Sequence, residues 1–221
     1  MNGYDWWMRR LKRAGQLFHC LRLDHFRGLE SYWAIPFGKE DGRDGVWEKG
    51  PGMDFIKKAK ETVPELTLIA EDLGILTAEA EAFIQESGLP RMRVLQFAFD
   101  GNPENFHLPE YHPKNSVVYT GTHDNPTLVG WISGLTEAEK KGAAEALGAD
   151  ALTIDAVLAA GRNSAGDVFV APVQDYLGIG EGGRMNTPGE TSGNWTWRMS
   201  GKDWAAFRNL EMDFRRGAAA N

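Results

Sequence analysis

The chain has 221 residues, of which 42 % are apolar, and a formal net charge of −7. This apolar share is enough for a folded core and argues against a wholly disordered chain. The acidic balance, without a block of Lys and Arg, disfavours nucleic-acid binding, and no apolar run approaches the ~20 residues of a membrane span.

The first part of the chain alternates helical and extended patterns. Apolar side chains recur at helical spacing through Tyr4, Trp7, Met8 and Leu11, and Gly15 is a stop signal. Spacing, N-cap and stop signals predict helices at residues 4–15, 53–62 and 77–87, the last between an N-cap Thr77 and Gly88. Short apolar runs predict strands at residues 17–23 and 66–70.

The alternation continues in the second part of the chain. Apolar runs predict strands at residues 94–99, 117–120 and 168–173, the last interrupted by Pro172. Helices are expected at residues 136–147, which are rich in alanine, and at residues 154–160. The chain thus offers five apolar strands with helices between them, and it shows no tandem repeat or linker.

This order predicts an α/β fold, with a parallel sheet covered by helices on both faces. A closed β/α barrel has eight strands, so five strands fit either an open doubly wound sheet or the last five strands of a barrel. The chain opens in mid-pattern with a helix, which favours the second alternative, a partial (β/α)8 barrel whose N-terminal strands are absent.

Cysteine and tryptophan give two further expectations. The single cysteine, Cys20, lies in an apolar run and predicts a buried thiol in a reducing compartment. Four of the tryptophans are expected in the core: Trp33, Trp47, Trp131 and Trp204.

Three carboxylates stand at or just beyond predicted strand ends. Asp24 follows the first strand, Glu71 the second in "LIAEDLG", and Asp124 the fourth in "VVYTGTHDN". The carboxyl ends of parallel strands lie on one face of such folds, where active sites are built. A single acid at such a position is more often the N-cap of the following helix. Three acids at such positions, each with unusual neighbours, favour a catalytic site.

The neighbours indicate what each acid can do. Arg22 lies two residues before Asp24 and shares its face of the strand, so its cation would keep Asp24 ionised, as a nucleophile requires. Glu71 follows two apolar residues, a setting that favours the protonated form of a proton donor. Two carboxyl groups whose pKa values are shifted in opposite directions are typical of enzymes that cleave glycosidic bonds. His123 beside Asp124 could bond to substrate hydroxyls.

Several motifs of this chain resemble those of the 4-α-glucanotransferases, also called amylomaltases or disproportionating enzymes. They are "RLDHFRGLESYWAIP", "GPGMDF", "LIAEDLGILT", "RVLQFAF", "VVYTGTHDNPT" and "GNWTWR", in this order along nearly the whole chain. The resemblance implies an α-amylase-like, retaining (β/α)8 enzyme. Residues 1–221 would then be the C-terminal part of a single catalytic domain, beginning before its fourth strand.

The resemblance also implies roles for individual residues. Asp24 would be the nucleophile, Glu71 the general acid/base, and Asp124 the stabiliser of the distorted donor sugar. The substrate-binding candidates are Arg22, which would hold the nucleophile, His25, His123 and Asn194. For His25 and its neighbours Phe26 and Arg27, packing beneath the site is the alternative interpretation. One of Trp195 and Trp197 could face the cleft.

The implied function is transfer of α-1,4-glucan segments from a donor to an acceptor glucan, without a metal or organic cofactor. His25 and His123 lack metal-ligand spacing, and no phosphate-binding glycine motif occurs. The alternatives are an α-glucan hydrolase using the same acids, and an inactive glucan-binding fragment. The partners would be glucans and the missing N-terminal half of the barrel, not nucleic acid or a membrane. The compartment would be the cytoplasm, or the plastid stroma if the source is a plant.

Overall fold

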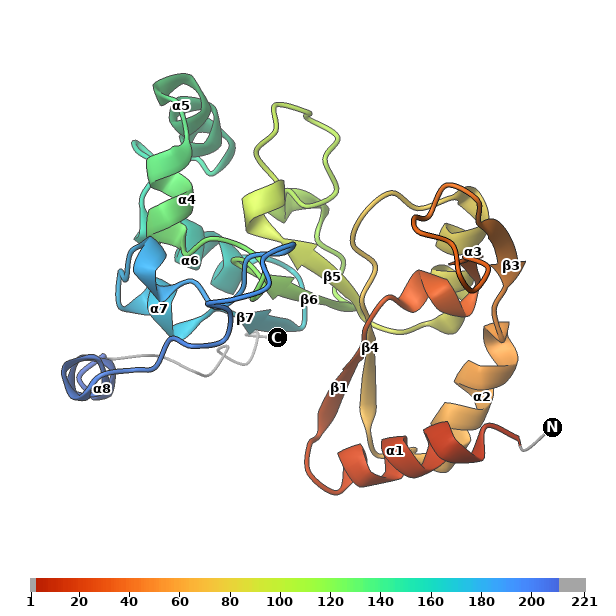
Figure 1. Ribbon diagram of the computed structural model, residues 1–221. Coiled ribbons are helices and arrows are strands. Elements are labelled where there is room, and N and C mark those ends of the chain that lie inside the picture. The colour runs from red at the N-terminus through yellow and green to blue at the C-terminus, as the bar shows by residue number, and fades with distance from the viewer. Residues whose placement is uncertain (1–2, 211–221) are drawn as a thin grey trace, which may run out of the picture. The chain divides into compact units, whose positions relative to one another are not determined.

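The computed structural model describes residues 3–210 of the chain and divides it into two units, Met1–Met92 and Arg93–Asn221. Helices and strands alternate in both units, so the chain has the α/β class that its sequence predicts (Figure 1). No helix within the described residues is long and apolar enough to cross a membrane.

The helices of the first unit follow the sequence signals closely. They are α1 (Asp5–Gly15), α2 (Gly52–Thr62) and α3 (Ala78–Ser87). Met8 and Leu11 of α1 are buried, as their helical spacing predicts. Thr77 caps α3 by accepting a hydrogen bond from the Ala80 amide at 3.3 Å, and Gly88 ends it with a φ of 63°, a left-handed conformation that glycine adopts without strain.

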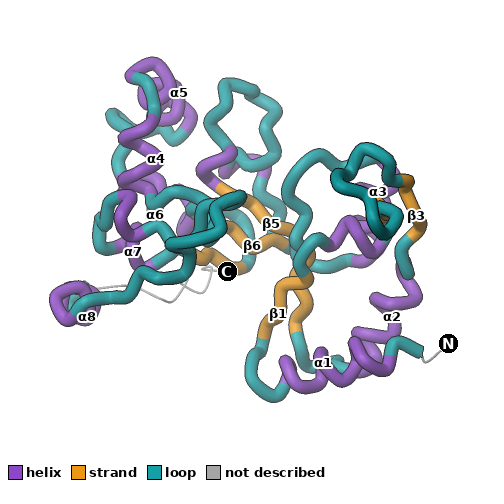
Figure 2. The backbone as a smooth tube through the Cα atoms, in the orientation of Figure 1, coloured by secondary structure: helices purple, strands orange, loops and turns teal. Residues whose placement is uncertain are grey.

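Two parallel strands form the centre of the first unit. They are β1 (Cys20–Leu23) and β4 (Thr67–Ala70), which lie side by side (Figure 2). Their pairing places Leu23 opposite Ala70. The prediction of a buried Cys20 is wrong, because its side chain is exposed at the first position of β1. Leu17 and Phe18, the apolar neighbours on which that prediction rested, are also exposed.

The sequence did not predict an antiparallel ribbon, β2 (Ser31–Ala34) and β3 (Val46–Lys49), which follows a 3-10 turn at Phe26–Leu29. Trp33 and Trp47 face each other across it with ring centroids 5.4 Å apart. The prediction that both lie in the core is wrong, since 41 % of Trp33 and 57 % of Trp47 is exposed. Within residues 3–210, the two-stranded ribbon leaves a large part of both rings open to solvent.

A three-stranded sheet, in the order β5–β6–β7, forms the centre of the second unit, and β5 begins two residues before that unit's first residue. Its strands are β5 (Arg91–Val94), β6 (Ser116–Tyr119) and β7 (Val168–Val170), and β6 and β7 are parallel. A strand lies at or beside each of the five predicted positions: β1, β4 and β7 are shorter than predicted, β6 is shifted by one residue, and β5 overlaps its predicted range only at Val94. Within the described residues, hydrogen bonds join them as one pair and one triplet.

Two of the predicted strand bounds are wrong. The strand predicted at 94–99 lies instead at Arg91–Val94, and Leu95–Phe97 is a 3-10 turn, because a short buried apolar run has the same pattern in a strand and in a turn. The strand predicted at 168–173 ends at Val170, because Pro172 lacks an amide N–H and instead precedes α7 (Val173–Tyr176).

The other helices of the second unit are α4 (Leu128–Gly134), α5 (Glu137–Ala146), α6 (Ile154–Asn163) and α8 (Gly201–Arg208). The sequence predicted only α5 and α6. It did not predict α4, α7 and α8, which are short. Val118 of β6 and Leu128 of α4 belong to the buried apolar cluster of this unit. Trp131 packs against that cluster, in line with its predicted place, whereas Trp204 is exposed and that prediction is wrong.

Candidate active site

Asp24 and Glu71 lie at adjacent strand ends in the first unit. Leu23 and Ala70 are register partners on parallel strands, and each carboxylate residue directly follows one of them. The Glu71 amide donates to the Leu23 carbonyl at 3.0 Å, so the pairing extends to the catalytic candidates themselves. The sequence rule that parallel strands end at one edge therefore holds for this pair.

Arg22 contacts Asp24, as their two-residue spacing predicts. Arg22 Nη2 lies 3.3 Å from Asp24 Oδ1. The Asp24 side chain is 81 % exposed and that of Arg22 is 25 % exposed, so solvent screens much of their attraction. Arg22 Nη1 also lies 3.8 Å from the Met92 sulfur, which helps to fix the guanidinium beneath the acid.

The backbone after Asp24 folds onto Glu71. His25 has a φ of 46°, in the left-handed region that residues other than glycine seldom adopt, and its amide donates to Glu71 Oε2 at 2.8 Å. The Leu73 amide donates to Glu71 Oε1 at 2.8 Å. The apolar setting expected for Glu71 is thus incomplete, since two backbone amides face its carboxyl group.

His25 contributes its backbone to Glu71 and its ring to packing. A Cβ atom at Gly28 would lie 2.8 Å from His25 Cδ2, so the imidazole lies close against this glycine. Phe26 is fully buried, and Arg27 lies over the Trp47 ring at 4.6 Å. The packing interpretation of these two residues is therefore confirmed.

A cavity of about 520 Å³ lies beside Asp24 within the first unit. Asp24, Arg22 and His25 line its polar part, and its apolar part is formed by side chains of α1, α2 and β1. Tyr32 of β2 also lines it, and its hydroxyl donates to Glu48 at 2.9 Å. The volume of this cavity lies in the range of small-ligand pockets.

Asp124 lies in the second unit on a tight loop after β6. Asn125 Oδ1 accepts hydrogen bonds from the Thr122 amide at 2.8 Å and from the Thr122 hydroxyl at 2.9 Å. The Asp124 amide in turn donates to the Thr122 hydroxyl at 3.3 Å. The sequence "GTHDN" therefore folds as a self-bonded turn that projects the Asp124 side chain, which is 46 % exposed, toward solvent.

Three groups contact Asp124: His123 from within that turn, and Asn186 and Arg184 from outside it. Asn186 Nδ2 donates to Asp124 Oδ1 at 2.6 Å, and His123 Nε2 lies 3.5 Å from Asp124 Oδ2. Arg184 Nη2 donates to the Asp124 carbonyl at 2.7 Å. Asn186 and Arg184 were not predicted.

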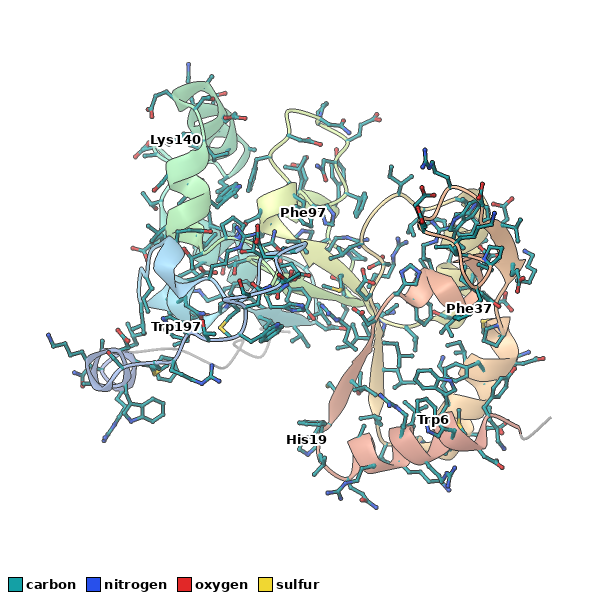
Figure 3. All side chains as sticks on the ribbon, viewed as in Figure 1. Trp6, His19, Phe37, Phe97, Lys140 and Trp197 are labelled. Atoms are coloured by element: carbon teal, nitrogen blue, oxygen red, sulfur yellow. The ribbon has the colours of Figure 1, made fainter. Side chains whose placement is uncertain are left out.

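The segment around Trp195 returns to His123. The two rings lie 5.0 Å apart at 41°, and Trp195, with a φ of 61°, is 52 % exposed. Asn194, by contrast, uses its side chain within its own loop: Oδ1 accepts from the Thr187 amide at 2.9 Å and Nδ2 donates to the Glu190 carbonyl at 3.0 Å. Trp197, labelled in Figure 3, lies further along this segment.

The family model that matches this chain is described as 4-alpha-glucanotransferase and covers residues 1–204. The chain belongs to this family. The motifs that carry the resemblance in the sequence include the carboxyl ends of β1, β4, β5 and β6.

Three members of the family show how much of it the chain spans. It is 45 % identical to the 4-alpha-glucanotransferase of Thermus thermophilus over 89 % of its own length and 41 % of the relative. It is 39 % identical to the chloroplastic/amyloplastic enzyme of Solanum tuberosum, covering 97 % of this chain and 37 % of that one. The amylomaltase of Streptococcus agalactiae in complex with acarbose matches with a TM-score of 0.85 and 31 % identity, over 93 % of this chain and 43 % of that one. The chain thus spans about two fifths of these relatives.

Asn186 and Arg184 are the functional candidates in this member of the 4-alpha-glucanotransferase family that the sequence motifs did not predict. They stand in "GRMNTPG", a segment rich in glycine in which no apolar period or strand end marks a site. The only local signal is an Arg and an Asn two residues apart in a loop. Among residues 3–210, no group of three or more His, Cys, Asp or Glu side chains is placed to hold a metal ion.

Proposed function

We propose that this chain carries the catalytic carboxylates of a 4-α-glucanotransferase, which moves α-1,4-glucan segments between maltooligosaccharides or starch-type glucans. The observation that carries the proposal is the pairing of β1 with β4, which sets Asp24 and Glu71 at neighbouring strand ends. Family membership supports the substrate class.

The reaction is a retaining double displacement. Asp24 attacks the anomeric carbon while Glu71 gives a proton to the departing glycosidic oxygen, and a covalent glucosyl-enzyme forms. Glu71 then takes the proton from the 4-hydroxyl of an acceptor glucan, whose oxygen displaces Asp24. Retaining enzymes place the two carboxyl groups about 5–5.5 Å apart, which adjacent parallel strands at a spacing of ~4.8 Å readily supply.

The contacts around each acid fit these roles. Arg22 Nη2 contacts Asp24 Oδ1 and can hold the carboxylate in place for attack. The two backbone amides at Glu71 fix the orientation of its carboxyl group. Each carboxyl oxygen keeps a second lone pair, so Glu71 can carry the proton it transfers while these bonds persist.

Asp124 acts on the donor sugar rather than on the scissile bond. Held by Asn186 and flanked by His123, it would accept hydrogen bonds from hydroxyls of the distorted ring. The exposed Trp195 ring beside His123 offers a flat apolar surface on which a sugar face can stack. His25 and Asn194 act in this proposal by shaping the loops around the sugar.

The finer fold proposal is a partial (β/α)8 barrel made of its last five strands, with residues 1–221 as the C-terminal part of one catalytic domain. It is supported by the share of the relatives that the chain covers. In the described residues, β1 pairs only with β4, so its other edge has no strand beside it. Trp6 of α1, labelled in Figure 3, is 55 % exposed. The partner proposed for this edge is the upstream segment of the longer relatives, and the compartment proposed is the cytoplasm or a plastid.

The function is tested with maltotriose. The protein is the 221 residues joined behind the upstream segment of the Thermus thermophilus relative, hereafter the extended chain. Transfer gives glucose together with a ladder of longer oligomers, and Asp24→Asn abolishes both. Short products alone would instead identify a hydrolase, and glucan binding without turnover would identify a non-catalytic glucan-binding protein.

A further inference from the structure

A buried acid that takes no part in the proposed reaction lies in α7. Asp175 is 1 % exposed, and burial raises the pKa of its carboxyl group although two hydrogen bonds oppose that shift. Asp175 Oδ2 accepts from the Thr120 hydroxyl at 2.6 Å, and Oδ1 accepts from the Leu128 amide at 2.8 Å. Both bonds are buried, so breaking either leaves a polar group without a partner.

The two partners of Asp175 bracket the loop that carries Asp124. Thr120 directly follows β6, and Leu128 is the first residue of α4. The loop between them, residues 121–127, holds the turn described above. One carboxyl group therefore joins the point where this loop leaves the sheet to the point where it enters the helix.

Gln174, the residue before Asp175, contacts the segment whose side chains bind Asp124. Gln174 is 5 % exposed, and its Nε2 donates to the Gly183 carbonyl at 2.9 Å. Gly183 directly precedes Arg184, whose guanidinium donates to the Asp124 carbonyl at 2.7 Å. Asn186, the residue that donates to the Asp124 carboxylate, follows in the same segment.

We propose that Gln174 and Asp175 are positioning residues for Asp124: Asp175 ties both ends of the 121–127 loop, and Gln174 ties the segment that carries Arg184 and Asn186. The proposal rests on the proposed function for its consequence in catalysis. In this proposal Asp175 acts through its hydrogen bonds and not through its charge, so a neutral residue that makes the same bonds should replace it. In Asp175→Asn the amide oxygen can accept from Leu128, and the amide nitrogen can donate to the Thr120 hydroxyl, which also serves as an acceptor.

The first test is amide hydrogen exchange in the 221-residue chain itself. Asp175→Leu removes both links and should speed exchange at Leu128 and residues 121–127 by at least about tenfold, the factor expected for one lost buried hydrogen bond. In Asp175→Asn, the exchange rates of the same amides should stay within about threefold of those in the native chain. The control is Ser116→Ala, which removes a partly buried hydrogen bond to the Pro113 carbonyl at the opposite end of β6. Equal exchange at residues 121–128 in Asp175→Leu and the control would overturn the proposal.

The second test separates positioning from mere stability. In the extended chain, Asp175→Leu should lower kcat on maltotriose about a hundredfold, and Asp175→Asn should keep kcat and its pH profile. In an Asp124→Asn background, Asp175→Leu should lower kcat much less, because Asp124, the residue through which Asp175 acts, is already disabled. Equal losses in both backgrounds would refute positioning. If the native extended chain shows no transfer, the proposed function fails, while hydrogen exchange still decides whether the loop is tied.

Discussion

The hydrogen bond from Asn186 to Asp124 makes a quantitative prediction. Asn186→Leu keeps the approximate volume of the side chain and removes the donor that lies 2.6 Å from Asp124 Oδ1. A hydrogen bond to a charged group is worth ~1.5–3 kcal/mol, and the 46 % exposure of Asp124 places this bond at the lower end. A loss of ~1.4 kcal/mol of transition-state stabilisation is about tenfold in rate.

The assay is the rate of maltotriose disproportionation by the extended chain, with kcat and KM measured separately. Asn186→Leu should lower kcat/KM about tenfold. Asn209→Leu, the same substitution after α8, is the control and should leave the rate unchanged. Asn186→Asp should be worse than Asn186→Leu at neutral pH, because it sets a second carboxylate against Asp124, and the gap should narrow as the pH falls. Wild-type activity in Asn186→Leu would refute the role assigned to this bond.

Three further predictions use other features of the structure. An α-maltosyl fluoride donor, whose leaving group needs little protonation, should restore the first step in Glu71→Gln but not in Asp24→Asn; equal rescue of both would contradict the assigned roles. Cys20 is exposed, so a thiol reagent should modify the native 221-residue chain within the time that it modifies the denatured chain, and full protection would contradict the exposed β1 start. Thr136→Ala removes the capping box of α5 and should lower the free energy of unfolding by ~1 kcal/mol in a urea titration, whereas Thr62→Ala, at the end of α2, should change it less.

Elements with strong local signals could be predicted from the sequence. Helix α3 has its cap at Thr77 and its stop at Gly88, and both act as expected. The β2–β3 ribbon could not be predicted, because its pairing joins residues 31–34 to 46–49 across a loop without a recognisable two-residue turn. The exposed Trp33 and Trp47 follow from the same cause: composition places tryptophan in a core, whereas only tertiary structure shows whether a layer covers the ring.

The candidate site divides in a similar way. Asp24 and Arg22 could be paired from their spacing alone, and the strand ends brought Glu71 to the same edge. The backbone amide of His25 on Glu71 could not be foreseen, because it depends on one residue adopting a positive φ. Asn186 was missed because a loop residue that contacts Asp124 across 62 positions of sequence leaves no local pattern.

The central claim is that Asp24 forms the covalent bond to the sugar, and trapping that intermediate tests it most directly. The Glu71→Gln extended chain is mixed with α-maltosyl fluoride, so that the C1–F bond breaks as the Asp24 carboxylate bonds to C1 and fluoride leaves. Without its acid/base, the second step should be slow enough for the glucosyl-enzyme to accumulate. Peptide mass spectrometry should find the added maltosyl mass on the peptide containing Asp24, and on no peptide when Asp24→Asn is added. A label on a different carboxylate, or none while fluoride is still released, would contradict this account.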